Sequence, residues 1–274
     1  MGRFSRSWQM FKASWRVLRS RKELAVFPLL SGVANLVAAV VFLTPAVFTI
    51  DRDAENGATP ATYVLGIACY LVCAYVTIFF NAALVSQANL ALKGGEPSVS
   101  SGLRTAGGLW ARILPWALLS ATVSLVLRAI EERLGFLGRI IIGMIGMAWH
   151  LVTYLVLPVM VLERAGTKGS IKRSTEMFRA TWGENVLGNV GIGVFGFLLF
   201  LPGVLVAGLG FAAGGAVAWV CFAVAVVWFL AAAVVTSALS GIYQTALYHF
   251  AAARTVPQEF AAADLGNAFP PKRR

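Results

Sequence analysis

Six long stretches of this chain contain no Lys, Arg, Asp or Glu and consist mainly of Leu, Val, Ile, Phe and Ala. They cover residues 24–50, 61–92, 113–127, 140–162, 186–209 and 216–251. The hydrocarbon core of a bilayer is about 30 Å thick, so a helix needs roughly 20 apolar residues to cross it. Five stretches reach that length, and Ala129 and Ile130 extend the shorter one past Arg128, whose long side chain can reach the interface. The pattern predicts an all-α polytopic membrane bundle of six transmembrane helices.

The composition of the chain agrees with this class. Apolar residues make up 58% of it and charged residues 13%, against roughly 45–50% and 25% in soluble domains. A transmembrane β-barrel is disfavoured, because its strands alternate apolar and polar residues instead of forming unbroken apolar runs. The polar segments between the stretches are too short to bury cores of their own. We therefore expect one membrane domain over 1–251, followed by a cytoplasmic tail over 252–274.

The positive charge is concentrated in alternate polar segments. Nineteen of the 23 Lys and Arg residues fall in 1–23, 93–112, 163–185 and 252–274, and the intervening segments hold the other four. Cytoplasmic loops carry such an excess, so we expect a multi-pass protein of the cell (plasma) membrane with both termini in the cytoplasm. The formal net charge of +11 then reflects orientation and attraction to anionic lipid headgroups. No nucleic-acid partner is expected.

The segment before the first stretch has the pattern of an amphipathic helix lying in the plane of the membrane interface. Its aromatic residues recur at helical spacing, as Phe4, Trp8, Phe11 and Trp15, while basic residues occupy the other faces. Interfacial helices combine aromatic anchors with a basic polar face in this way. Such a helix can simply orient the spans in the bilayer, or it can gather lipids or proteins, and the sequence leaves both roles open.

The same pattern occurs a second time. Residues 6–15 read RSWQMFKASW and residues 173–182 read RSTEMFRATW, with six of ten positions identical. We interpret the two copies as an internal repeat. Further interface residues are Phe178 and Trp182 of the second copy and Trp110 of a weaker third candidate at 98–112. The hypothesis divides the membrane domain into three units of interfacial helix plus helical hairpin, at 1–92, 93–162 and 163–251.

One histidine lies near the middle of the fourth stretch. His150 stands between Trp149 and Tyr154, one helical turn from Thr153. A histidine at membrane depth is a functional-site candidate by default. No carboxylate lies within the spans to complete an acid–histidine proton relay, so a hydrogen-bonded packing role is favoured over a functional one.

Asparagine side chains mark a second polar group in the spans. Asn35 and Asn81 can hydrogen-bond between the first and second spans, and such residues more often join helices than line a substrate path. Gln87 and Asn89, at the end of the second stretch, are expected to be hydrated at the cytoplasmic interface.

Prolines and glycines predict where the helices bend and turn. Pro202 falls near the middle of the fifth stretch and predicts a kink, whereas Pro158 lies near the cytoplasmic end of the fourth, where it should cost little. The uncharged, glycine-rich segment at 208–215 predicts a tight turn between the last two spans. The final stretch exceeds the bilayer thickness, so its helix should continue past the membrane through Tyr243 and His249.

No catalytic or metal-binding signature accompanies these elements. The sequence lacks a phosphate-binding glycine loop, a zinc-binding helix motif and a nucleophile elbow. The acidic segment 51–57 departs from a calcium loop because its glycine falls one place late. Three cysteines, Cys69, Cys73 and Cys221, lie inside spans and are interpreted as packing residues. We expect no cofactor and no metal, and an enzyme is the least favoured class.

The two ends of the chain carry a family resemblance. The patterns SW…FKASWRVLRSRKELAVFPLLSG and LYHFA…VPQEF…AFPPK resemble an uncharacterised family of prokaryotic six-span integral membrane proteins. That resemblance implies the six-span fold and transfers neither an activity nor functional residues. The chain is more loosely similar to the membrane domain attached to some glycerophosphodiester phosphodiesterases. It contains no phosphodiesterase domain, so that activity is not implied.

Two functions from different classes fit these features. The favoured one is a non-enzymatic membrane module that organises lipids or partner proteins at the cytoplasmic face, because the aromatic-basic helices are the most distinctive motif. The alternative is a transporter or channel for a neutral or lipid-like solute, since ion-coupled carriers usually keep a charged residue within their spans. A large polar cavity would favour transport, and a tightly packed bundle would favour the first function.

Overall fold

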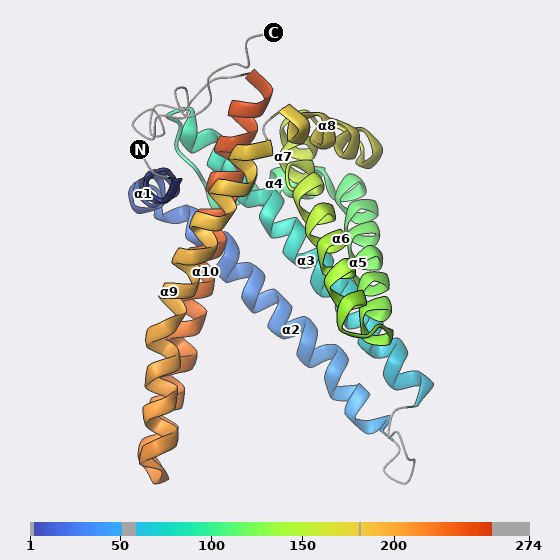
Figure 1. Ribbon diagram of the computed structural model, residues 1–274, viewed down its shortest axis with the longest axis vertical. Helices are drawn as coiled ribbons and strands as arrows, with labels where there is room; N and C mark the ends of the chain where they lie inside the picture. Colours follow the sequence, from blue (N-terminus) through green and yellow to red (C-terminus); the bar gives the residue numbers. More distant parts are fainter. Residues whose placement is uncertain (1–2, 51–58, 181, 254–274) are drawn as a thin grey trace. The chain divides into compact units, whose positions relative to one another are not determined.

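The computed structural model describes residues 3–50, 59–180 and 182–253, and the surroundings of side chains over 9, 11–50, 59–179 and 195–252 (Figure 1). The fold is all-α, as predicted. Within the described residues, six apolar helices are long enough to cross a membrane, which confirms the expected number of spans. They cover Lys22–Phe48, Pro60–Leu92, Trp110–Arg133, Phe136–Leu162, Phe195–Ala213 and Gly215–Ala252.

The chain forms two compact units, each assembled from separate segments. Unit 1 combines Met1–Val26, Gln87–Ser98 and Met177–Arg274, and unit 2 combines Phe27–Ser86 and Val99–Glu176. Nothing in this grouping tests the internal repeat, so the division into three successive units stays a prediction.

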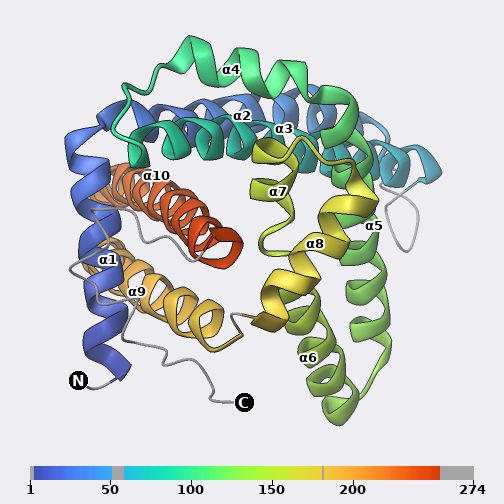
Figure 2. The same ribbon diagram turned by 90° about the horizontal axis from the view of Figure 1, so that it is seen from above.

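Unit 1 is built on a hairpin of two long helices, α9 (Trp182–Ala213) and α10 (Gly215–Ala253). They lie side by side in both views (Figures 1 and 2). Gly214 and Gly215 connect them with φ of 64° and 58°. L-residues with side chains rarely adopt this left-handed region, so glycine permits the reversal. The predicted tight turn is therefore confirmed, and α10 continues as one helix through Tyr243 and His249.

Three glycines seven residues apart bring the two helices of this hairpin together. A Cβ atom on Gly203 would lie 2.5 Å from Phe229 Cε1, and one on Gly210 would lie 2.5 Å from Cys221 Cβ. At Gly196 the nearest atom would be Cγ2 of Thr236, at 3.1 Å. Small residues let the backbones of membrane helices approach closely, which increases van der Waals contact. The glycine heptad thus defines the face of α9 that packs on α10.

The same hairpin accommodates a proline. Pro202 cannot donate the backbone hydrogen bond to Leu198 that a helix would otherwise make, yet α9 continues through it. One turn earlier, Trp228 Nε1 of α10 donates to the Leu199 carbonyl oxygen at 2.7 Å. A buried or lipid-facing indole needs such an acceptor, so this bond joins the helices beside the proline.

Unit 2 contains most of α2 (Val26–Phe48), most of α3 (Pro60–Leu92), α4 (Val99–Gly108), α5 (Trp110–Arg133), α6 (Phe136–Thr153), α7 (Val156–Leu162) and most of α8 (Thr167–Ala180). Hydrogen bonds tie α2 to α3: Asn35 Nδ2 donates to Thr77 Oγ1 at 3.0 Å. Near the other end of α2, the hydroxyls of Thr49 and Thr62 lie 2.8 Å apart.

The fourth span, Phe136–Leu162, is interrupted just before Pro158, whereas the sequence predicts a bend only at Pro202. Helix α6 ends at Thr153 and α7 begins at Val156. Pro158 has no N–H for the Tyr154 carbonyl, and its ring crowds that carbonyl, so the helix is interrupted one turn before the proline. The carbonyls in the last turn of α6 take different donors, and that of Leu151 accepts from the Tyr154 backbone N–H at 3.4 Å. One of them, on Val152, accepts a hydrogen bond from Ser174 Oγ of α8 at 2.6 Å.

Candidate functional site

Helix α1 (Arg3–Ser20) docks on the α9–α10 hairpin through one of its faces. Phe11, Ser14, Val17 and Leu18 are buried on that face. The ring of Phe11 packs against that of Phe195 of α9 in a tilted arrangement, with 3.7 Å between ring centroids. Helix α1 is seen nearly end-on in Figure 1, where the hairpin runs along the page, and lengthwise in Figure 2. It therefore lies crosswise to the two span helices.

The opposite side of α1 is basic and open. Lys12, Arg16 and Arg19 are exposed, and Trp15 is 41% exposed. We call these four residues the α1 basic face. Because Phe11 and Leu18 are held by the hairpin, the basic side chains are directed away from it by the helical period. This geometry suits a polyanionic surface such as a layer of lipid headgroups.

The predicted aromatic stripe of α1 divides between two environments. Phe11 contacts protein, and the ring of Trp15, 6.3 Å from that of Phe11, lies at the open edge. Phe4 and Trp8 belong to the helix, but their side chains lie outside the described residues. The membrane-interface role of the stripe stays a prediction.

The second copy of the motif lies mainly in α8 and has a similar division. Ser170, Ser174 and Met177 are buried, and Thr167 Oγ1 donates to the Arg112 carbonyl of α5 at 3.4 Å. Lys168, Lys172 and Arg179 are exposed. Arg173 is drawn into ion pairs with Glu163 at 3.4 Å and Glu176 at 3.8 Å. We call Lys168, Lys172 and Arg179 the α8 basic face.

The remaining predicted interface aromatics fall at helix starts or edges. Phe178 of α8 is half-buried. Trp110 is the first residue of α5 and is 59% exposed. Trp182 is the first residue of α9, and its side chain lies outside the described part of the chain. Helices α5 and α9 thus each begin with a tryptophan, a residue that favours the membrane–water boundary.

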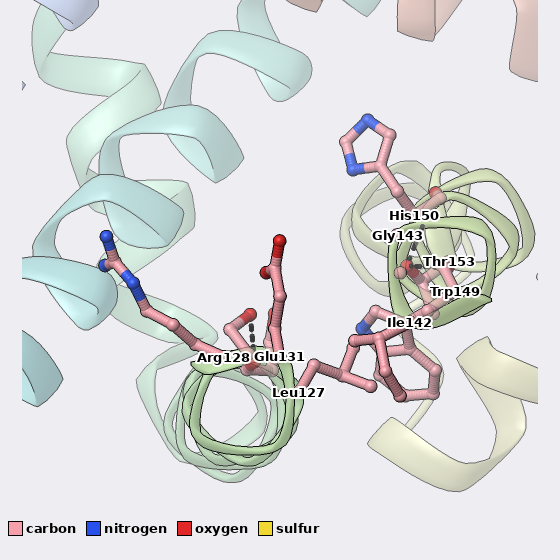
Figure 3. A pocket seen from close by; sticks show the side chains of 11 residues that line it. Leu127, Arg128, Glu131, Ile142, Gly143, Trp149, His150 and Thr153 are labelled. Carbon is pink, nitrogen blue, oxygen red and sulfur yellow. Dashed lines mark hydrogen bonds between the residues drawn. The ribbon is translucent and has the colours of Figure 1, made fainter. Parts of the chain in front are cut away.

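A groove of about 400 Å³ runs between α5 and α6 of unit 2 and contains two of the predicted intramembrane residues (Figure 3). Its lining residues are Ser120, Ser124, Leu127, Arg128, Glu131, Ile142, Gly143, Gly146, Trp149, His150 and Thr153. Figure 3 shows Glu131 and His150 projecting to the same side of the hairpin, with Leu127 and Ile142 between the helices. We call it the α5–α6 groove.

The polar groups of this groove differ in how they are satisfied. Ser124 Oγ donates to the Ser120 carbonyl at 2.9 Å, and Thr153 Oγ1 donates to the Trp149 carbonyl at 2.7 Å. Hydroxyls bonded within their own helix are tolerated at membrane depth. The ring of His150 is exposed and contacts Tyr154 edge-on, with centroids 6.0 Å apart. Its imidazole nitrogens therefore face the groove opening instead of a packed core.

A second groove of about 380 Å³ lies on another side of α5, against α3. Its lining residues are Thr62, Tyr63, Gly66, Ile67, Tyr70, Ser124, Leu125 and Arg128. We call it the α3–α5 groove. Ser124 and Arg128 line both grooves, so the two grooves lie on either side of these residues and meet at them.

The predicted asparagine pair is only half realised. Asn35 Nδ2 donates to Thr77 Oγ1 and to Ser31 Oγ, the latter at 3.5 Å. Asn81 does not take part in this hydrogen-bonded group. Gln87 is buried instead of hydrated, and its Oε1 accepts from the Ser98 backbone N–H at 2.9 Å. A buried amide needs such partners, and the chain supplies one eleven residues further on.

Asn89 has a protein partner as well. Its Oδ1 lies 2.8 Å from Nε2 of His249, so the two form a hydrogen bond between the end of α3 and the end of α10. The expectation that Asn89 depends on water for its hydrogen bonding is therefore wrong. The sequence could not predict this pair, because 160 positions separate its two residues.

Within the described residues, no group of three His, Cys, Asp or Glu side chains is arranged to hold a metal ion. The three cysteines are free thiols. Sequence reasoning did not identify Arg128 as a residue that lines both grooves, because it considered only the reach of its side chain to the interface. The signal was present, because Ser120, Ser124 and Arg128 recur every fourth residue on one helical face.

Comparison with known proteins places the chain in a family. A family of unknown function, DUF6159, matches residues 61–257, which extend from α3 to beyond α10. The chain belongs to this family. No curated protein matches it. The predicted resemblance to an uncharacterised family of six-span membrane proteins is thereby confirmed at this level, whereas the prokaryotic origin and the likeness to phosphodiesterase membrane domains stay predictions.

Proposed function

We propose that this protein is a non-enzymatic membrane module that gathers anionic lipid at the cytoplasmic face through its two amphipathic helices. The observation that carries the proposal is the docking of α1. Phe11 packs against Phe195 of a span helix, while the basic residues of the same helix remain exposed. The basic residues are thus carried on a helix that lies crosswise to α9 and α10, which is the orientation of an interfacial helix beside membrane spans.

Electrostatic attraction supports a preference for anionic lipid. Each Lys or Arg near an anionic membrane surface contributes about 1 kcal/mol of attraction. The α1 and α8 basic faces together present six exposed basic side chains. Of the basic residues in α8, Arg173 is partly neutralised by Glu163 and Glu176, so the other three supply most of its attraction.

The test measures which lipids accompany the protein. The protein is reconstituted in mixed phosphatidylcholine and phosphatidylglycerol vesicles and extracted with its surrounding lipid by a styrene–maleic acid copolymer. We expect phosphatidylglycerol to be enriched over the bulk bilayer, and Arg16→Gln with Arg19→Gln to reduce the enrichment. The matched control, Arg133→Gln with Arg139→Gln, removes the same charge from exposed positions at the turn between α5 and α6. Equal enrichment in wild type and both variants would contradict the proposal.

A second function, passage of a neutral or lipid-like solute, is favoured by one observation. The α5–α6 groove opens beside His150, a polar side chain that is exposed near the middle of the fourth span. The test is the rate at which glycerol enters proteoliposomes, followed by light scattering. A rate above that of empty liposomes, lowered by His150→Leu, would support passage, and a rate equal to that of empty liposomes would reject it for this solute.

A further inference from the structure

We propose that Arg128 anchors a diacyl glycerophospholipid with an amine-bearing headgroup, whose two acyl chains occupy the α5–α6 and α3–α5 grooves. The inference concerns unit 2 alone and does not rest on the lipid-gathering surface proposed above. Its elements are a cation at the junction of two grooves, an acidic side chain beside that cation, and glycines along the groove walls.

The guanidinium of Arg128 is suited to a phosphate. Its side chain is 78% exposed, and its nearest ion-pair partner, Glu132, is 3.9 Å away, beyond hydrogen-bond distance. Arginine binds phosphate with a planar fork of donors, and an arginine near the end of a span can extend to the phosphate level of the bilayer. In Figure 3 the Arg128 side chain points away from α6, whereas Leu127 points toward it.

Glu131 determines which headgroup fits. It lines the same groove one turn beyond Arg128 and projects to the side shared with His150 (Figure 3). An ionised carboxylate only accepts hydrogen bonds, so it favours an ammonium group and disfavours a second anionic group. A phosphoethanolamine headgroup places a phosphate and a primary ammonium next to each other, which matches Arg128 followed by Glu131. Phosphatidylglycerol lacks that ammonium.

The grooves provide separate places for two chains. They lie on two sides of α5 and share Ser124 and Arg128, so chains that leave one headgroup at Arg128 can enter both. A Cβ atom on Gly143 of α6 or Gly66 of α3 would meet nothing within 4 Å, which shows open space at both walls. Each volume falls within the range of roughly 300–1,000 Å³ found for ligand pockets.

The experiment titrates the intact protein in detergent with four separate probes and counts bound molecules by native mass spectrometry. The probes are dioleoylphosphatidylethanolamine, dioleoylphosphatidylglycerol, oleoyl-lysophosphatidylethanolamine and dioleoylglycerol. We expect wild type to bind one dioleoylphosphatidylethanolamine more tightly than any other probe. Because hydrogen bonds to charged groups are the stronger class, Arg128→Gln should weaken this binding by about tenfold or more.

Further variants separate the headgroup from the chains. Glu131→Gln should reduce the preference for the ethanolamine headgroup over the glycerol headgroup. Gly143→Leu and Gly66→Leu should each fill one groove. Each variant should therefore bind the diacyl lipid more weakly, while its binding of the lysolipid stays largely unchanged. The matched control is Gly32→Leu on α2, where a Cβ also meets nothing within 4 Å. Thermal melting of each variant identifies any that fails to fold.

Several results would overturn the proposal. If Arg128→Gln and Glu131→Gln fold and keep the wild-type lipid affinity and headgroup selectivity, the proposed headgroup site is wrong. Equal binding of lysolipid and diacyl lipid by wild type would remove the two-chain arrangement. Arg16→Gln with Arg19→Gln should leave this binding unchanged, so the groove site can fail while the α1 surface holds, and the reverse can also occur.

Discussion

The aromatic rings of Phe11 and Phe195 pack against each other with 3.7 Å between their centroids and 31° between their planes, which fixes α1 to the long hairpin of unit 1. This contact joins residues 184 positions apart and turns an amphipathic segment into part of the folded protein. The contact determines which face of α1 is turned toward the hairpin. The apolar face of α1 is occupied by protein, and the basic face, with Trp15 at its edge, is left for the surroundings.

Phe11→Ala is predicted to release α1 from the hairpin. Phe11 is 6% exposed, and removing a buried phenylalanine ring costs about 3–5 kcal/mol in protein cores. We expect α1 to become sensitive to protease in nanodiscs while the spans stay intact. Trp15→Ala removes a larger but 41% exposed ring and should leave α1 protected. Equal protease sensitivity in the two variants would contradict the docking contact.

Gly203→Val is predicted to separate the α9–α10 hairpin. Its Cβ would overlap Phe229 and Trp228, and overpacking costs about 1–3 kcal/mol. The thermal unfolding temperature in detergent should fall. Gly208→Val provides the control on the same helix, because a Cβ there meets nothing within 4 Å. If Gly208→Val lowered the unfolding temperature as much, general helix effects and not close packing would explain the loss.

Trp228→Phe is predicted to weaken the same hairpin by a different route. The substitution keeps an aromatic ring but removes the Nε1 donor that bonds the Leu199 carbonyl at 2.7 Å. A net loss of about 1 kcal/mol is expected. Trp219→Phe, on the same helix at a 78% exposed position, should cost less. The comparison is made by unfolding in detergent, and equal losses would argue against a role for the bond.

Ser174→Ala is predicted to loosen α8 from the broken end of α6. It removes the 2.6 Å bond to the Val152 carbonyl, which is part-buried, so the loss should be at most the roughly 1–3 kcal/mol of an unsatisfied buried group. Hydrogen exchange at α7 and α8 should become faster. Thr175→Ala removes only a bond within α8, to the Ile171 carbonyl, and serves as the control. Unchanged exchange in Ser174→Ala would mean that the bond does not hold α8.

The number of spans could be predicted because charge is excluded from the bilayer whatever the packing of the helices. Bends could be predicted less well. Pro202 stays within a continuous helix, whereas Pro158 accompanies a break, and the difference depends on partners distant in sequence. Ser174 supplies a donor for a carbonyl freed at the break, and no local pattern around Pro158 reveals it.

The candidate sites were predictable only in part for a similar reason. Helical spacing identified the α1 stripe, but an aromatic side chain packs as well on protein as on lipid, so the spacing could not direct Phe11 toward Phe195. Arg128 became a site residue only through its place between two grooves. That place depends on α3 and α6 lying on different sides of α5.

The most direct measurement of the orientation of α1 is the accessibility of single spin labels along it in nanodiscs. After Cys69, Cys73 and Cys221 are replaced by Ala, labels are placed at positions 12, 14, 16, 17 and 19 and exposed to a nickel-chelating headgroup lipid. We predict strong relaxation by nickel at 12, 16 and 19 and protection at 14 and 17, because the latter two side chains are buried. Uniform accessibility, or protection at 12, 16 and 19, would contradict the docked, basic-face-outward arrangement.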